Sequence, residues 1–158
     1  MSIVSRILAL DYGRKRIGVA VSDPLGITAQ AKPTIIVKNQ SEALAKILGL
    51  IEEYEPGHIV IGLPLDQHGK VGKFAEEVRR FAEKLRNKTA LPIEFFDERF
   101  SSKQAEKVLH QLGEKTGAKK TRIDALSAVL ILQSYMEYLH IAGKYGLHGR
   151  HGRSGTKE

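Results

Sequence analysis

Residues 6–23 constrain the fold more than any other stretch of this 158-residue chain. Two apolar runs, at residues 7–10 and 17–21, flank a short polar turn. Continuous apolar runs of this length, bounded by turn signals, are typical of buried strands. The pattern therefore predicts a strand, a tight turn and an antiparallel return strand. One carboxylate, Asp11, ends the first run where the chain enters the turn.

The remaining apolar periodicity alternates between strands and helices. Leu44, Ile47, Leu48 and Ile51 recur at helical spacing and predict one face of a helix. The predicted elements after the hairpin are a strand at 33–37, a helix capped by Asn39 or Ser41 and ending at Tyr54, a strand at 58–62, a helix at 74–85, a strand at 93–96, a helix from Ser101 to Gly113, and an almost wholly apolar, largely buried helix at 122–140. Three antiparallel strands followed by two right-handed crossovers predict an α/β fold with a five-stranded mixed sheet flanked by helices.

The chain length fits one domain, at residues 1–142. Residues 143–158 are rich in Gly, His, Arg and Ser, and we expect a disordered basic tail there. The absence of cysteine excludes disulfides and thiolate metal sites. No apolar run approaches the roughly 18 residues that span a bilayer, so we expect a soluble cytoplasmic protein. A net charge of +7 favours a polyanionic partner such as nucleic acid, although solubility explains it equally well.

Acidic side chains follow two of the predicted strands and begin the last helix. Asp11 ends the first strand, Asp97 and Glu98 end the fifth, and Asp124 lies in the first turn of the helix. Because these two strands should be parallel, their acids should meet at one edge of the sheet. Clustered carboxylates are unfavourable unless a cation neutralises them, and Mg²⁺ or Mn²⁺ prefers oxygen ligands. Two such ions about 4 Å apart can activate water against a phosphodiester.

Each acid also has a purely structural explanation. Asp11 could accept backbone amides in an Asx-type turn, and Asp97 could pair with Arg99. Thr121 and Asp124 have the spacing of a helix-capping pattern. The pattern alone therefore leaves both readings open for each acid.

Basic residues lie beside these acids in the sequence. Arg14, Lys15 and Arg16 form the turn of the hairpin, and Arg99 follows the fifth strand. They either hold the phosphates of a nucleic acid or serve as a solvated turn and a neutralising partner. The histidines lack zinc-ligand spacing and no phosphate-binding glycine loop is present, so we exclude both kinds of site.

Four motifs occur in order along residues 6–140: L-D-Y-G-R-K-R-I-G-V-A at 10–20, G-L-P-L at 62–65, D-E-R-F-S-S at 97–102 and I-D-A at 123–125. Together they resemble the YqgF (RuvX) family of Holliday-junction resolvases, which has an RNase H-like fold. The resemblance implies a nuclease that uses Mg²⁺ or Mn²⁺. It implies Asp11, Glu98 and Asp124 as metal ligands, with Asp97 as the alternative to Glu98. The family is linked to four-way DNA junctions and to processing of the 5′ end of the 16S rRNA precursor.

Three functions are compatible with this pattern. The leading one is a metal-dependent endonuclease acting on branched DNA or precursor rRNA, and a two-fold dimer would suit a symmetric junction although no sequence feature requires one. The second is a non-catalytic nucleic-acid-binding module, because residues 62–64 lack the acid that well-studied resolvases of this fold carry after the fourth strand. The third is an actin-like phosphotransferase. Such proteins usually place a Ser or Thr near the glycine of this hairpin, where this chain has Arg14, Lys15 and Arg16, and they need two lobes, whereas 158 residues hold one.

Overall fold

The computed structural model describes residues 5–65, 68–97 and 120–143. The helix predicted from Ser101 to Gly113 lies outside these residues, as does the tail predicted at 143–158 except for its first residue. The described elements, in chain order, are β1 (Ile7–Asp11), β2 (Arg16–Ser22), β3 (Ala29–Ile36), α1 (Gln40–Tyr54), β4 (His58–Leu63), α2 (Lys73–Arg86), β5 (Ile93–Asp97) and α4 (Lys120–Ile141). None of the helices in the described part of the chain is long and apolar enough to span a membrane.

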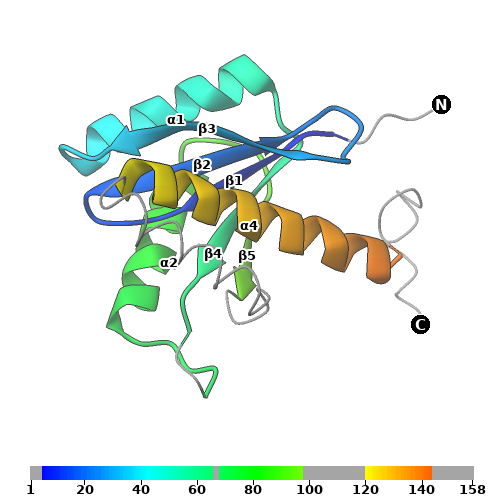
Figure 1. The fold of residues 1–158 in the computed structure, drawn as a ribbon. Coiled ribbons are helices and arrows are strands. Elements are labelled where there is room, and N and C mark those ends of the chain that lie inside the picture. Colours follow the sequence, from blue (N-terminus) through cyan, green and yellow to red (C-terminus); the bar gives the residue numbers. More distant parts are fainter. Residues whose placement is uncertain (1–4, 66–67, 98–119, 144–158) are drawn as a thin grey trace.

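The five strands form one mixed sheet in the order β3-β2-β1-β4-β5. β2 pairs antiparallel with β1 and β3, whereas β4 pairs parallel with β1 and β5. Helix α4 crosses one face of this sheet, and α1 and α2 cover the other (Figure 1). We call these the α4 face and the α2 face. The predicted α/β fold with a five-stranded mixed sheet is confirmed.

The central strand β1 is buried on both faces, which explains its continuous apolar run. Leu8 and Leu10 pack with residues of α1 and α2, whereas Ile7 and Ala9 pack with residues of α4. All four side chains are fully buried. Successive side chains of a strand point to opposite faces, so this division fixes which face each later residue of β1 occupies.

Strand β3 begins at Ala29, four residues before the predicted start. Its first half, Ala29-Gln30-Ala31-Lys32, has weak strand propensity, and the side chains of Gln30 and Ala31 are exposed. These residues nevertheless pair with β2, with Ala31 opposite Ala20 and Ala29 opposite Ser22. The prediction was wrong because backbone pairing with a neighbouring strand, rather than local propensity, determines where β3 starts.

Helix α1 begins as predicted at the Asn39 cap, whose side chain accepts a hydrogen bond from the amide of Glu42 at 2.8 Å. It ends at Tyr54, and the residue after it, Glu55, is left-handed, with a φ of 50°. A close contact requires the glycine at position 57. A Cβ at this position would lie 2.4 Å from the Cβ of Ser5, so only glycine permits this close approach.

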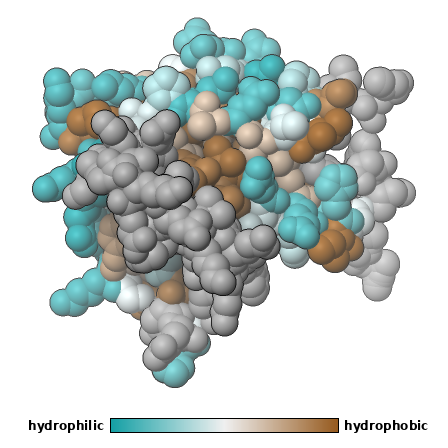
Figure 2. All heavy atoms as spheres, viewed as in Figure 1, coloured by the Kyte–Doolittle hydropathy of each residue, from teal (hydrophilic) through white to brown (hydrophobic). Residues whose placement is uncertain are grey.

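Helix α4 packs on the sheet along one stripe. Ala128, Ile131, Leu132, Tyr135 and Leu139 on this stripe are buried. The prediction of a largely buried helix is confirmed for its middle, whereas Tyr138 and Ile141 near its end are 47% and 80% exposed. Figure 2 shows the molecule from the same side as Figure 1. Apolar residues reach the surface near the middle of this view, where α4 crosses the sheet, and hydrophilic residues surround them.

A series of hydrogen-bonded side chains connects α4 to the first residues of β4 and β5. The Tyr135 hydroxyl donates to Glu94 Oε1 at 2.5 Å and lies 3.1 Å from Nε2 of His58. Burial lowers the pKa of the His58 imidazole below its usual 6.5, and the Glu94 carboxylate offsets this only in part. His58 is therefore neutral in the folded protein at neutral pH.

This lowered pKa predicts that stability falls as the pH drops below 6.5. The unfolded state takes up a proton on His58 more readily than the folded state does. The stability that neutral His58 contributes is therefore complete above pH 6.5 and is lost as the pH falls toward the pKa of the folded state. We expect His58→Gln to flatten the dependence of the melting temperature on pH between about 5.5 and 7. The exposed His140→Gln variant is the control, and an unchanged slope in His58→Gln would contradict the expectation.

Candidate functional site at the carboxyl edge of the sheet

Two of the predicted acids lie at one edge of the sheet. Asp11 is the last residue of β1 and Asp97 the last residue of β5, and both are half-buried. Strand β4 lies between them and ends at Leu63, which pairs with Asp97. With neighbouring strands about 4.8 Å apart, the two Cα atoms are about 10 Å apart. The structure thus brings both acids to the carboxyl edge of the parallel strands.

The pleat assigns these two acids to opposite faces. Asp11 lies between Leu10 and Tyr12, which pack on the α2 face, so the alternation directs its side chain to the α4 face. Phe96 packs on the α4 face, so the same alternation directs Asp97 to the α2 face. Asp11 and Asp97 therefore share an edge without sharing a face.

The predicted metal ligands are only partly within the described residues. There, no three His, Asp or Glu side chains come together in a way that could hold a metal ion. Of the predicted ligands, the described side chains include that of Asp11, whereas Glu98 and the side chain of Asp124 lie outside them. The backbone of position 124 belongs to the first turns of α4. The metal site at this edge stays a prediction.

The turn after Asp11 depends on a glycine. A Cβ on Gly13 would lie 2.5 Å from the carbonyl oxygen of Arg16, which no other residue could accommodate without a shift. The carbonyl of Lys15 accepts a hydrogen bond from the amide of Val37 at 2.9 Å, which ties the turn to the end of β3. The Lys15 side chain is exposed and that of Arg16 is half-exposed. Arg99 lies outside the described residues.

Arg14 binds a carboxylate of α2. Its Nε lies 2.9 and 3.2 Å from the two oxygens of Glu77, and a terminal nitrogen lies 2.9 Å from Oε1. Its guanidinium also lies over the ring of Phe74, 5.0 Å from the centroid. Such a bidentate pair has a fixed geometry. Arg14 therefore holds the turn against α2 in this state, in addition to any role toward a ligand.

A hydrogen-bonded network continues from Glu77 to α1. The Tyr12 hydroxyl donates to Glu77 Oε2 at 3.4 Å and accepts from Gln40 at 3.2 Å, and Lys84 donates to Gln40 at 2.6 Å. Burial raises the pKa of Tyr12, so its hydroxyl stays protonated at neutral pH. Two charged residues of α2, Glu77 and Lys84, are thus hydrogen-bonded to residues of other elements. The helical spacing alone gave no signal for this, because the partners of Glu77 come from distant elements.

Solved structures with the same fold include resolvases. The structure described as "T. thermophilus RuvC in complex with Holliday junction substrate" matches with a TM-score of 0.56 and 15% identity, over 85% of this chain and 96% of that one. The fowlpox virus resolvase with Holliday junction DNA matches with a TM-score of 0.53 and 15% identity, over 85% and 98%. At this identity the likeness shows the fold alone, which is that of RuvC-like RNase H-fold nucleases.

Sequence comparison identifies the family. Two relatives named "Putative pre-16S rRNA nuclease" are those of Koribacter versatilis, 46% identical over 86% of this chain and 89% of its own, and of Sulfurihydrogenibium sp., 48% identical over 89% and 96%. The model of the family described as "RuvX: Holliday junction resolvase" matches residues 5–138. The chain therefore belongs to the RuvX family.

Proposed function

We propose that this protein is a divalent-metal-dependent endonuclease that cleaves structured nucleic acid, either branched DNA or the precursor of 16S rRNA. Its membership of a family of resolvases and pre-16S rRNA nucleases supports nuclease activity. The observation that carries the proposal is the position of Asp11, which ends the central strand at the carboxyl edge and is assigned to the α4 face. Sites of open α/β sheets form at this edge.

Helical periodicity supports Asp124 as a second acid of this site. Position 124 precedes the buried Ala128 by four residues and the buried Leu132 by eight, so it belongs to the stripe of α4 that packs on the sheet. The helix begins at the end of the sheet where the β1–β2 turn lies (Figure 1). Asp124 would therefore approach Asp11 from above the same face.

The pleat supports Glu98 over Asp97 as the third acid. The alternation assigns Asp97 to the α2 face, so Glu98 would belong to the α4 face if the extended conformation of β5 continued through it. Glu98 would then join Asp11 and Asp124, while Asp97 would stay outside the cluster.

These three residues form a set of hard oxygen donors, which fits Mg²⁺ or Mn²⁺. When bound, such ions supply an activated water and neutralise charge on the scissile phosphate. Asp11, Glu98 and Asp124 would hold them, and Lys15, Arg16 and Arg99 would hold phosphates of the substrate. Matched cuts in a symmetric junction would require two copies related by a two-fold axis.

Metal removal tests this proposal. The purified chain is incubated with a four-way DNA junction and with a 16S precursor RNA fragment, in Mg²⁺, in Mn²⁺ or in EDTA. We expect cleavage of at least one substrate with either ion, its loss in EDTA and its return when the ion is restored, because the ions supply the water and the charge. The rates on the two substrates decide between DNA and RNA. Binding without cleavage in every condition would contradict the proposal.

A non-catalytic nucleic-acid-binding module is the second candidate. One observation favours it: β4 contributes no carboxylate to the carboxyl edge. The strand ends in Gly62 and Leu63, and Pro64 and Leu65 follow it. This candidate predicts salt-sensitive binding without metal-dependent cleavage in the same experiment.

A further inference from the structure

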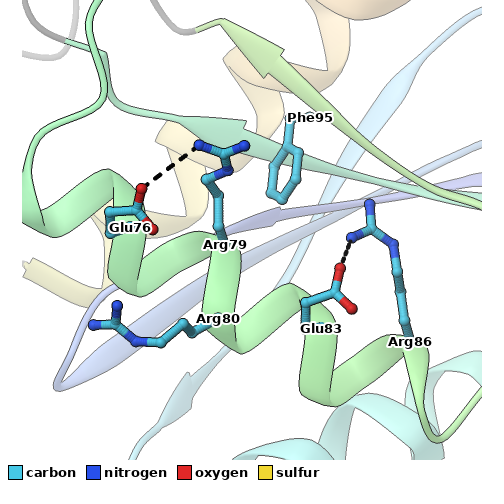
Figure 3. A pocket seen from close by; sticks show the side chains of 6 residues that line it. All are labelled: Glu76, Arg79, Arg80, Glu83, Arg86 and Phe95. Carbon is cyan, nitrogen blue, oxygen red and sulfur yellow. Dashed lines mark hydrogen bonds and ion pairs between the residues drawn. The ribbon is translucent and has the colours of Figure 1, made fainter.

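A groove with a volume of about 390 Å³ lies beside helix α2, between it and β5 (Figure 3). It belongs to the α2 face, opposite the face assigned to Asp11. Its floor includes the ring of Phe95, and its remaining lining is charged. The lining residues are Glu76, Arg79, Arg80, Glu83, Arg86 and Phe95.

Two of the three arginines in the groove flank the aromatic ring. Figure 3 shows the guanidinium groups of Arg79 and Arg86 on either side of Phe95. Arg86 lies 5.5 Å from the ring centroid and donates to the carbonyl of Ile93 at 2.9 Å. It also contacts Glu83 at 2.5 Å, so several contacts fix its position. Arg86 therefore gives the groove a positioned positive charge.

The other two arginines are available to a ligand. Arg79 lies 3.7 Å from Glu76, and the two side chains are 49% and 52% exposed. Exposed pairs of this kind contribute little to stability, so an anion can replace the carboxylate as partner of Arg79 at small cost. Arg80 is exposed and has no ion pair with any residue that the structure describes. Three arginines against two glutamates line the groove, and Figure 3 shows the guanidinium of Arg80 directed away from Phe95. The net positive charge of this lining suits an anion.

The spacing of the arginines suits a chain of phosphates. Arg79 and Arg86 are seven residues apart, so they lie on one side of α2 and about 10.5 Å apart along its axis. A strand of B-DNA carries one phosphate for roughly every 3.4 Å of its axis, and neighbouring phosphates are farther apart along the winding strand itself, so this row faces at most about three phosphates. Guanidinium groups are well suited to phosphate oxygens because they donate in a planar fork.

The groove begins near the carboxyl edge of the sheet, but on the α2 face rather than on the α4 face to which Asp11 is assigned. Glu77, in the second turn of α2, binds the turn that follows Asp11. Phe95 precedes Asp97 by two residues and lies on the same face. A nucleic acid that contacts both the Asp11 site and the groove must therefore pass around the carboxyl edge, which a second arm can do and a straight duplex cannot.

We propose that the groove between α2 and β5 binds the phosphate backbone of a second arm of a branched nucleic acid. This inference rests on the proposed function, because it takes one arm to be engaged at the Asp11 site. The groove then contributes to the preference for branched over linear substrates.

The double variant Arg79→Ala/Arg80→Ala tests this inference against Lys38→Ala/Lys46→Ala. Both variants remove two exposed positive charges, but the lysines lie outside the groove, in and just before α1. Affinity for a four-way DNA junction and for a linear duplex is measured in EDTA over a range of salt concentrations. We expect the arginine variant to bind the junction more weakly, with the slope of log K against log salt reduced by about 2, because each phosphate contact contributes about 0.9. The lysine variant should bind as the parent does.

Each other result overturns the inference. Equal weakening by the two variants would show a general charge effect, and equal weakening on junction and duplex would exclude a second-arm contact. Unchanged junction binding by the arginine variant would also refute the inference. So would an acidic peptide that binds the groove and leaves the affinity for the junction unchanged. Binding is measured without cleavage, so failure of the groove is distinguishable from failure of the nuclease proposal. A parent that binds no DNA junction at all overturns this inference, and the nuclease proposal is then tested on the precursor RNA alone.

Discussion

Replacing Asp11 by Asn is expected to reduce cleavage by at least about a hundredfold while junction binding and folding persist. Residues that merely support metal ligands already cost about 10–100-fold when changed, and Asp11 is proposed as a direct ligand. The amide keeps the shape of the side chain but removes the negative charge that attracts a divalent cation. The test is single-turnover cleavage in Mg²⁺, together with calorimetric titration of Mn²⁺ into each protein.

Three further variants sharpen this test. Glu53→Gln removes an exposed acid of α1 and should leave cleavage unchanged. Glu98→Gln should resemble Asp11→Asn, whereas Asp97→Asn should retain most activity, because the pleat assigns Asp97 to the α2 face. If Asp11→Asn cuts as fast as the parent, the proposed site is wrong. If Asp97→Asn is the inactive one of the pair, the assignment of Glu98 is wrong.

Replacing Phe81 by Ala is expected to lower the free energy of unfolding by about 3–5 kcal/mol, the range for removing a large buried side chain. Phe81 is 1% exposed and packs with Val78 and Leu85 of α2. Its ring also lies 4.6 Å from that of Tyr12, centroid to centroid. Urea denaturation followed by circular dichroism measures the loss.

The control for this variant is Ile141→Ala. Ile141 is 80% exposed, so its truncation should change stability by less than about 0.5 kcal/mol. Because Phe81 supports the residue next to Asp11, its loss should also reduce cleavage at temperatures where the variant is still folded. A change in unfolding free energy as small as that of the control would show that the core around Phe81 is not packed as described.

The sequence predicted the elements whose burial is complete. Strand β1 and strand β4 carry continuous apolar runs because both of their faces are covered, and such runs are visible without any structure. The start of β3 was not predictable in this way, since Ala29 joins the sheet through its pairing with Ser22 rather than through its own propensity. Residues that form structure only through a partner leave little local signal.

The candidate site was likewise predictable in part. The sequence placed Asp11 and Asp97 at one edge, because that follows from strand order alone. It left open which acid of the Asp97–Glu98 pair faces Asp11, since that depends on which face each residue of β5 occupies. Phe96, packed on the α4 face, assigns Asp97 to the α2 face, and the role of Glu98 stays a prediction. The pairing of Arg14 with Glu77 was equally hidden, because it joins residues 63 positions apart.

The long sequence separation between β1–β3 and α4 has a consequence for synthesis of the protein. The α4 face of the meander, including Ile7, Ala9 and Ala20, is covered by a helix that begins roughly 100 residues later. At about 5–20 residues per second, a ribosome needs on the order of 5–20 s to produce that cover. During this interval the nascent sheet exposes one apolar face. On the proposed site, Asp124 also emerges last, so nuclease activity cannot precede completion of nearly the whole domain.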